Sequence, residues 1–179
     1  MLQIRNLTIV LGKKTILQNL SFTVERGQCV IIEGKNLSGK STLLRALMGQ
    51  TKPTHGQILI DHRDLHELST SEKKHYHQSI GVLLQHPLLK VHDVVNAEHE
   101  TLVKDLSFYE QKKHDFGRAL KNHPSLVLLD EPLLGFDSEN AAEVRETLQE
   151  LKAAHVTILI TTTDRTPYLF LNSEKIIQL

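Results

Sequence analysis

The sequence has 179 residues, of which 21 are Lys or Arg and 21 are Asp or Glu, so its formal net charge at pH 7 is +0. This length suits one domain with its own core, and the balanced charge argues against nucleic acid as a partner. A single cysteine, Cys29, cannot form an internal disulfide and suits a reducing compartment. No apolar run approaches bilayer-spanning length, and the first residues lack signal-peptide features. We therefore expect a soluble, cytoplasmic protein that reaches a membrane only through a partner.

The beginning of the chain predicts strands. Apolar residues alternate over residues 2–24, which indicates two strands joined by a turn at 12–14. The all-apolar run at 29–32 is typical of a central strand that is covered on both faces. A glycine-containing loop at 34–39 then leads into a helix.

Helices and strands alternate from there to the end of the chain. Two helix starts carry the capping-box pattern, Ser69 with Glu72 and Ser107 with Glu110. The expected elements are a helix at 41–48 ended by Gly49, a strand at 58–60, a helix from 70 to 78, a strand at 82–84, a helix after Asp93 to about 105, a helix from 108 to about 122, a strand at 126–129, a helix at 138–154, and strands at 156–161 and 175–179. This alternation predicts an α/β fold with a mainly parallel sheet, to which the antiparallel opening is added.

A phosphate-binding loop lies between the strand at 29–32 and the helix at 41–48. Residues 34–41 fit the pattern G-x-x-x-x-G-K-[ST] in the strand–loop–helix context that the motif requires. Backbone N–H groups and the positive end of the helix suit polyphosphate, the lysine adds a charge for the β- and γ-phosphates, and the serine hydroxyl can bind Mg²⁺. The predicted nucleotide-binding residues are Gly34, Lys35, Asn36, Leu37, Ser38, Gly39, Lys40, Ser41 and Thr42.

A second candidate site follows the buried strand at 126–129, which ends in Asp130 and Glu131. In an open α/β sheet, ligands bind at the carboxyl ends of the strands. Asp130 can hold Mg²⁺ through a water molecule, and Glu131 can polarise an attacking water as a general base. Together with the phosphate-binding loop, the pair predicts an ATP site.

The series of motifs resembles the ABC ATPase family over nearly the whole chain. The matching segments are Asn36 and Ser38 in the P-loop (Walker A), the strand at 56–61, Gln85 in the Q-loop, Leu106-Ser107 at the start of the signature motif, Arg118-Ala119-Leu120 after it, Asp130-Glu131-Pro132 in Walker B, and Gly135-Phe136-Asp137 in the D-loop. The resemblance implies a P-loop NTPase core at about 1–85 and 119–179, with an N-terminal antiparallel β-subdomain and a reduced helical subdomain at about 86–118.

The resemblance also implies functional roles and cofactors. ATP and Mg²⁺ are the expected cofactors, and Gln85 is expected to contact Mg²⁺ and water and to sense a transmembrane partner. The implied metal-binding residues are Ser41, Gln85 and Asp130. The signature-like residues are Ser107, Phe108, Tyr109 and Glu110, Asp137 belongs to the D-loop, and Thr163 stands where the family has its switch histidine.

Four departures concern the closed dimer that the family forms around ATP. Phe108 and Tyr109 replace the signature glycines and are expected to obstruct the approach of a partner subunit, although Ser107 and Glu110 also fit a plain helix cap. Thr163 cannot supply an imidazole. Leu11 stands near the usual place of the aromatic residue that stacks on adenine. Finally, 21 residues between Gln85 and Ser107 leave room for one helix, so the helical subdomain is small.

The leading hypothesis is an ATP-binding subunit that couples ATP binding and slow hydrolysis to a separate transmembrane permease at the cytoplasmic face of the membrane. It would act as a homodimer, or as a heterodimer with another ABC ATPase. The alternative is a regulatory or assembly module of the ABC type that binds ATP and hydrolyses little of it. The neutral charge counts against an ABC ATPase that acts on nucleic acid.

Overall fold

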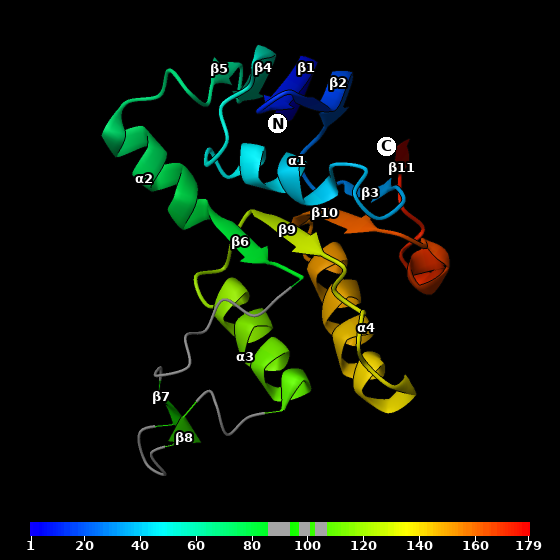
Figure 1. Ribbon diagram of the computed structural model, residues 1–179. Helices are drawn as coiled ribbons and strands as arrows, with labels where there is room; N and C mark the ends of the chain where they lie inside the picture. The colour runs from blue at the N-terminus through cyan, green and yellow to red at the C-terminus, as the bar shows by residue number, and fades with distance from the viewer. Residues whose placement is uncertain (86–93, 97–100, 103–106) are drawn as a thin grey trace.

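Two larger sheets form the centre of the fold, and the computed structural model describes residues 1–85, 94–96, 101–102 and 107–179 (Figure 1). One sheet is antiparallel with the order β2-β1-β4-β5, and the other has the order β11-β3-β10-β9-β6 with parallel neighbours. Their strands are β1 (Leu2–Leu11), β2 (Lys14–Val24), β3 (Cys29–Glu33), β4 (His55–Ile60), β5 (Arg63–Asp64), β6 (Ile80–Leu83), β9 (Leu126–Asp130), β10 (Thr157–Thr162) and β11 (Lys175–Gln178). The predicted parallel α/β core with an antiparallel N-terminal sheet is confirmed.

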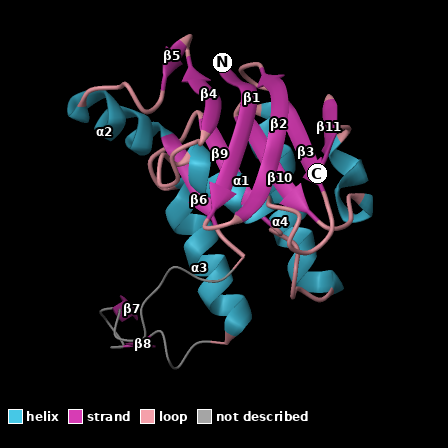
Figure 2. Ribbon diagram, turned by 45° about the horizontal axis from the view of Figure 1, so that its top comes forward, coloured by secondary structure: helices cyan, strands magenta, loops and turns pink. Residues whose placement is uncertain are grey.

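The helices lie on both faces of the parallel sheet. They are α1 (Lys40–Leu47), α2 (Thr70–Ser79), α3 (Phe108–Leu120) and α4 (Ser138–Ala153). Helix α1 lies between the two sheets, and α3 and α4 lie against the opposite face of the parallel sheet (Figures 1 and 2). The side chains of β3 alternate accordingly: Val30 and Ile32 join the core under the antiparallel sheet, whereas Cys29 and Ile31 join the core under α4. The strand is therefore covered on both faces, as its apolar run predicted.

The parallel register brings the predicted site segments to one edge of the sheet. Thr162 of β10 lies opposite Glu33 of β3, and Asp130 of β9 lies opposite Thr161. The P-loop leaves β3 at this edge, and the chain leaves β9 toward Glu131 beside it. Because parallel strands share a direction, their carboxyl ends gather where ligands of open sheets bind.

The helix predicted after Asp93 is wrong where the structure describes it. Val94–Asn96 form strand β7 and Thr101–Leu102 form strand β8, and the two pair antiparallel. The β-branched pair Val94 and Val95 favours an extended backbone over a helix. Residues 86–93, 97–100 and 103–106 lie outside the described part, and the proposed boundaries of the helical subdomain stay a prediction.

Other predicted elements differ from the structure by one to three residues at their ends, and strand β5 was not predicted. The strand expected at 82–84 is β6, and the helix that follows Ser107 ends at Leu120. A 3₁₀ helix at Thr166–Leu171 was not predicted. Within the ranges that the structure describes, no helix combines the length and the apolar character needed to cross a bilayer.

Candidate nucleotide-binding site

Helix α1 begins without a side-chain cap. Its N-cap is Gly39, which has a φ of 104° and no side chain that could accept a hydrogen bond from the helix. The first turn carries no acidic residue. A Cβ atom at Gly39 would lie 2.7 Å from Leu17 Cδ2, so both the backbone conformation and the space favour glycine. The first N–H groups of a helix need partners, and here an anion can supply them.

Lys40 lies across the loop that precedes this helix. Its Nζ donates hydrogen bonds to the carbonyl oxygens of Gly34, at 2.7 Å, and Lys35, at 3.1 Å, and the side chain is buried. Both partners are neutral, and no carboxylate among the described residues forms an ion pair with Lys40. The loop therefore keeps a positive charge at the start of α1, as the motif predicts.

Leu37 has an unusual conformation in the same loop. Its φ is 66°, in the left-handed region that non-glycine residues rarely adopt, and the side chain is 93% exposed. An exposed side chain leaves the backbone of Leu37 as the part that can face a phosphate. The sequence offered one signal for this, an apolar residue in the middle of a polar loop.

Ser41 and Asp130 face each other at the end of the sheet. Ser41 Oγ donates a hydrogen bond of 2.8 Å to Asp130 Oδ2, and the other carboxylate oxygen accepts one of 2.6 Å from Thr161 Oγ1. A hydroxyl and a carboxylate at this distance are the hard oxygen ligands that Mg²⁺ prefers, so these two predicted residues fit the ion. Gln85 follows β6 by two residues and is half-buried; its contact with Mg²⁺ stays a prediction.

The carboxylate of Glu131 is oriented by the end of β10. Its Oε2 accepts a hydrogen bond of 2.9 Å from Thr162 Oγ1, and its Oε1 accepts one of 2.6 Å from the backbone N–H of Thr163. Glu131 itself has a φ of 49° and is buried. Thr163, the predicted switch position, thus meets Glu131 through its backbone, while its side chain is exposed. Thr162 was not predicted, since nothing in the sequence places its hydroxyl opposite Glu131.

Comparisons with known proteins agree with this geometry. A family model described as ABC transporter matches residues 17–98. The chain is 35% identical over 147 residues to the zinc import ATP-binding protein ZnuC of Wigglesworthia glossinidia brevipalpis, covering 75% of this chain and 63% of that protein. It is 28% identical over 177 residues to the cell division ATP-binding protein FtsE of Bacillus subtilis, covering 82% of this chain and 78% of that protein.

Solved structures show the same fold. The dimeric ABC transporter cassette MJ0796 matches with a TM-score of 0.83 at 24% identity, covering 100% of this chain and 94% of that one. The structure of cbiO1 from Clostridium perfringens matches with a TM-score of 0.78 at 25% identity, covering 99% of this chain and 83% of that one. The chain is thus similar in sequence and in fold to ABC transporter ATP-binding proteins. It spans a little under two thirds of the length of the ZnuC relatives that it matches.

The signature-like segment starts α3 with a complete capping box. The backbone N–H and the hydroxyl of Ser107 both donate to Glu110 Oε2 at 2.7 Å, and the N–H of Glu110 donates back to Ser107 Oγ at 3.3 Å. These hydrogen bonds from Ser107 hold the pKa of Glu110 below its ordinary value. The helix-cap interpretation is thereby confirmed. The side chains of Phe108 and Tyr109 lie outside the described part, and their obstruction of a partner stays a prediction.

Two further residues concern the segment that follows Asp130. Asp137 of the D-loop caps α4, since its Oδ1 accepts a hydrogen bond of 2.8 Å from the N–H of Asn140. Lys112 of α3 was not predicted as a site residue. It lies buried against the segment that follows Asp130. There its Nζ donates a hydrogen bond of 2.7 Å to the carbonyl oxygen of Glu131.

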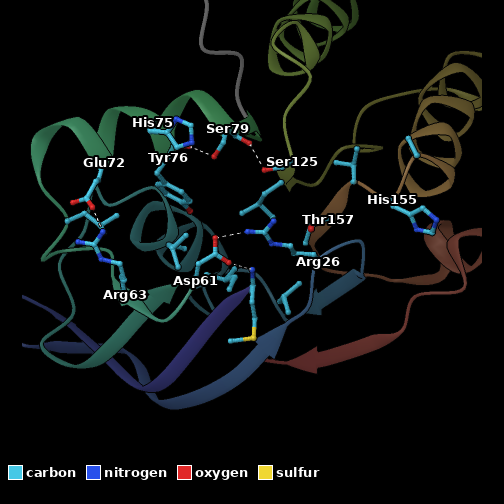
Figure 3. A pocket seen from close by; sticks show the side chains of 18 of the residues that line it. Arg26, Asp61, Arg63, Glu72, His75, Tyr76, Ser79, Ser125, His155 and Thr157 are labelled. Atoms are coloured by element: carbon cyan, nitrogen blue, oxygen red, sulfur yellow. Dashed lines mark hydrogen bonds and ion pairs between the residues drawn. The ribbon is translucent and has the colours of Figure 1, made fainter.

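A cavity of about 880 Å³ lies at the opposite edge of the parallel sheet, where β9 and β10 begin and α2 approaches the antiparallel sheet (Figure 3). Its charged side chains pair with one another. Asp61 accepts hydrogen bonds from the Met1 amine at 2.7 Å and from Arg26 at 2.8 Å, and Arg63 pairs with Glu72. Because the P-loop leaves the other end of the strands, this cavity takes no part in the ATP site.

Proposed function

We propose that the chain is the ATP-binding subunit of an ABC transporter, which couples ATP binding and slow hydrolysis to a separate membrane permease. The observation that carries the proposal is the uncapped start of α1, with Lys40 buried beside it and Ser41 held 2.8 Å from Asp130. Uncapped N–H groups and an ammonium group suit a triphosphate. Paired hard oxygens suit the Mg²⁺ that accompanies it.

Each residue of this site has a distinct role in the proposal. Backbone N–H groups of residues 34–42 and the ammonium of Lys40 bind the phosphates. Ser41, Gln85 and, through a water molecule, Asp130 would hold Mg²⁺, which would supply positive charge against the phosphates. Glu131 accepts the proton of the attacking water, because it is the carboxylate next to Asp130 at the same strand end. Each of its carboxylate oxygens accepts one hydrogen bond, from Thr162 or Thr163, and keeps a second lone pair for that proton.

The partner is inferred from the named relatives. ZnuC and the Fe(3+) ions import protein FbpC are ATP-binding proteins of import systems, and cbiO1 is described as part of an ABC transporter complex. By the same relation this chain would dock on a permease at the cytoplasmic face of the membrane. It would pair there with a second copy or with another ABC ATPase, as the dimeric MJ0796 cassette pairs.

A second candidate function is a regulatory or assembly module that binds ATP and hydrolyses little of it. One observation favours it: the signature-like helix start is filled by the carboxylate of its own Glu110. ATPase rates measured with and without the membrane protein encoded by a neighbouring gene separate the two. Stimulation by the membrane protein supports the transporter subunit, and an unchanged low rate supports the module.

The ATP site itself is tested by titrating fluorescent ATP into the parent and into Lys40→Ala. The substitution removes a charge-assisted contact worth about 1.5–3 kcal/mol, so binding is expected to weaken roughly ten- to hundredfold. Lys35→Ala is the matched control. Lys35 belongs to the same loop, its side chain is exposed, and only its backbone carbonyl takes part in the contacts described. Equal affinities of Lys40→Ala and the parent would refute the assignment.

A further inference from the structure

Lys112 is a buried lysine on the helix that carries the signature-like segment. Its side chain is 1% exposed, and its Nζ donates to the carbonyl oxygens of Glu131, at 2.7 Å, and Leu134, at 2.8 Å. The ammonium also lies 5.1 Å from the centre of the Phe136 ring. All three partners belong to the segment that links Walker B to the D-loop.

This segment is a tight turn, and Lys112 joins its two ends. The N–H of Leu134 already donates to the carbonyl of Glu131 at 3.1 Å, so that carbonyl accepts from the turn and from Lys112 together. A carbonyl has two lone pairs and can accept both hydrogen bonds. One ammonium therefore links α3 to the first and last residues of the turn that starts at Glu131.

The other side of the turn is attached to β10 and to the 3₁₀ helix that follows it. The Glu131 carboxylate accepts from Thr162 and Thr163, and the N–H of Leu133 donates to Tyr168 Oη at 3.1 Å. Glu131 is thus held at two points: its carboxylate by Thr162 and Thr163 at the end of β10, and its carbonyl by Lys112 of α3. A displacement of α3 would pull on the carbonyl while the carboxylate is held elsewhere.

Burying a charged side chain costs more free energy than burying an apolar one. Burial lowers the pKa of Lys112 to about 8, although Glu131 and Asp130 nearby act in the opposite direction. An apolar side chain of similar volume is often as stabilising as a buried charged group, or more so. A lysine here is therefore better explained by the two carbonyls that it joins than by packing.

We infer that Lys112 is a positioning residue, which ties α3 to the Glu131 turn and so makes the placement of the Glu131 carboxylate depend on the position of the signature-like helix. The inference rests on the proposed role of Glu131 as general base. It gives this chain a direct route from α3, which lies at the end of the predicted helical subdomain, to the reacting end of the proposed ATP site.

The test compares Lys112→Met with Lys113→Met in the full chain. Lys113 is the next residue of α3, is half exposed and pairs with Glu143 at the surface, so it matches the charge change without the buried contact. Single-turnover ATP hydrolysis is expected to slow about ten- to hundredfold in Lys112→Met, because small misplacements of a reacting group have effects of that size. The affinity for ATP should stay within twofold, and Lys113→Met should match the parent in both.

Hydrogen exchange of the peptide that contains residues 131–136 supplies the second readout. It is expected to exchange faster in Lys112→Met than in Lys113→Met, as the turn loses its link to α3. Lys112→Gln, which keeps a polar group, is interpreted in the same way if Lys112→Met does not fold. A rate within twofold of the parent, or a slower rate with unchanged exchange, would overturn the inference.

Glu131→Gln, measured alongside, separates this inference from the function on which it rests. If Glu131→Gln loses turnover and Lys112→Met keeps it, the positioning role is wrong and the proposed base stands. If Glu131→Gln hydrolyses ATP like the parent, the proposed base is wrong and the positioning role is overturned with it.

Discussion

The starts of α1 and α3 are two helix N-termini with opposite chemistry. At α1 the cap is Gly39, and no described side chain accepts from the first N–H groups. At α3 the cap is Ser107, and the carboxylate of Glu110 already occupies the N-terminal end. A helix N-terminus carries partial positive charge and unpaired donors, so the first can receive an external anion, whereas the second has supplied its own.

This difference bears on how an ABC dimer would form. The family resemblance implies that the P-loop of one subunit and the signature segment of the other meet at the γ-phosphate. Here only the P-loop end is open. A phosphate arriving at α3 would have to displace Glu110, whose ionised form is stabilised by Ser107. The comparison therefore predicts that the start of α1 can bind a phosphate, whereas the start of α3 is closed to a phosphate by Glu110.

The largest effect is expected for the turnover of ATP, from a substitution of Glu131 on the P-loop side of the site. Glu131→Gln removes the proposed base while leaving α1 unchanged, and general-base catalysis typically contributes about 10²–10⁴-fold. Turnover should fall close to background, and the affinity for ATP should stay that of the parent. Phosphate release with excess protein measures the rate, and an ATP titration provides the control. A variant that turns over as fast as the parent would remove Glu131 from the mechanism.

A smaller effect, on the free energy of unfolding, is expected from a substitution at the start of α3. Ser107→Ala removes the cap of α3, which should lower the free energy of unfolding by about 1 kcal/mol. ATP binding by the single chain should not change, because the described nucleotide contacts lie at α1. Urea unfolding and ATP titration test both expectations. Weaker ATP binding by Ser107→Ala would mean that the two helix starts are coupled within one chain.

The smallest effect concerns Leu37 in the open loop. Its left-handed backbone costs about 1–2 kcal/mol, and glycine removes that strain but loses about 0.5–1 kcal/mol of backbone entropy. Leu37→Gly should therefore raise the free energy of unfolding by less than about 1.5 kcal/mol. Thermal unfolding of the variant measures the change. A destabilised variant would show that the exposed side chain contributes to folding.

Local patterns predicted the helices and strands around the candidate ATP site, because each motif determines the backbone conformation of its own segment. The P-loop lies between a strand and a helix, Asp130 and Glu131 end a buried strand, and both capping boxes form as their spacing indicates. What the sequence could not show depends on distant contacts. Lys112 is 19 residues from Glu131 in the chain, and Thr162 is 31 residues from it. In the sequence, Lys112 is one of two adjacent lysines that look alike, and folding buries only one of them.

The remaining errors have local causes. The capping pattern at Asp93 outweighed the β-branched Val94 and Val95, which form a strand in the structure. Thr163 was assigned by its place in the sequence and by the imidazole that it lacks, whereas its contact with Glu131 uses the backbone N–H. A side-chain argument cannot anticipate a backbone donor, because every residue except proline carries one.

The dimerisation of the chain with ATP tests the contrast between the open and the closed helix start most directly. Light scattering of Glu131→Gln, in which hydrolysis cannot discharge a closed dimer, should give the monomer mass with and without Mg-ATP. The same measurement on Glu131→Gln with Phe108 and Tyr109 both replaced by glycine asks whether the aromatic pair adds to the closed cap. Dimerisation only after the replacement would support the obstruction by that pair. A tight ATP-dependent dimer of the unreplaced protein would contradict the account.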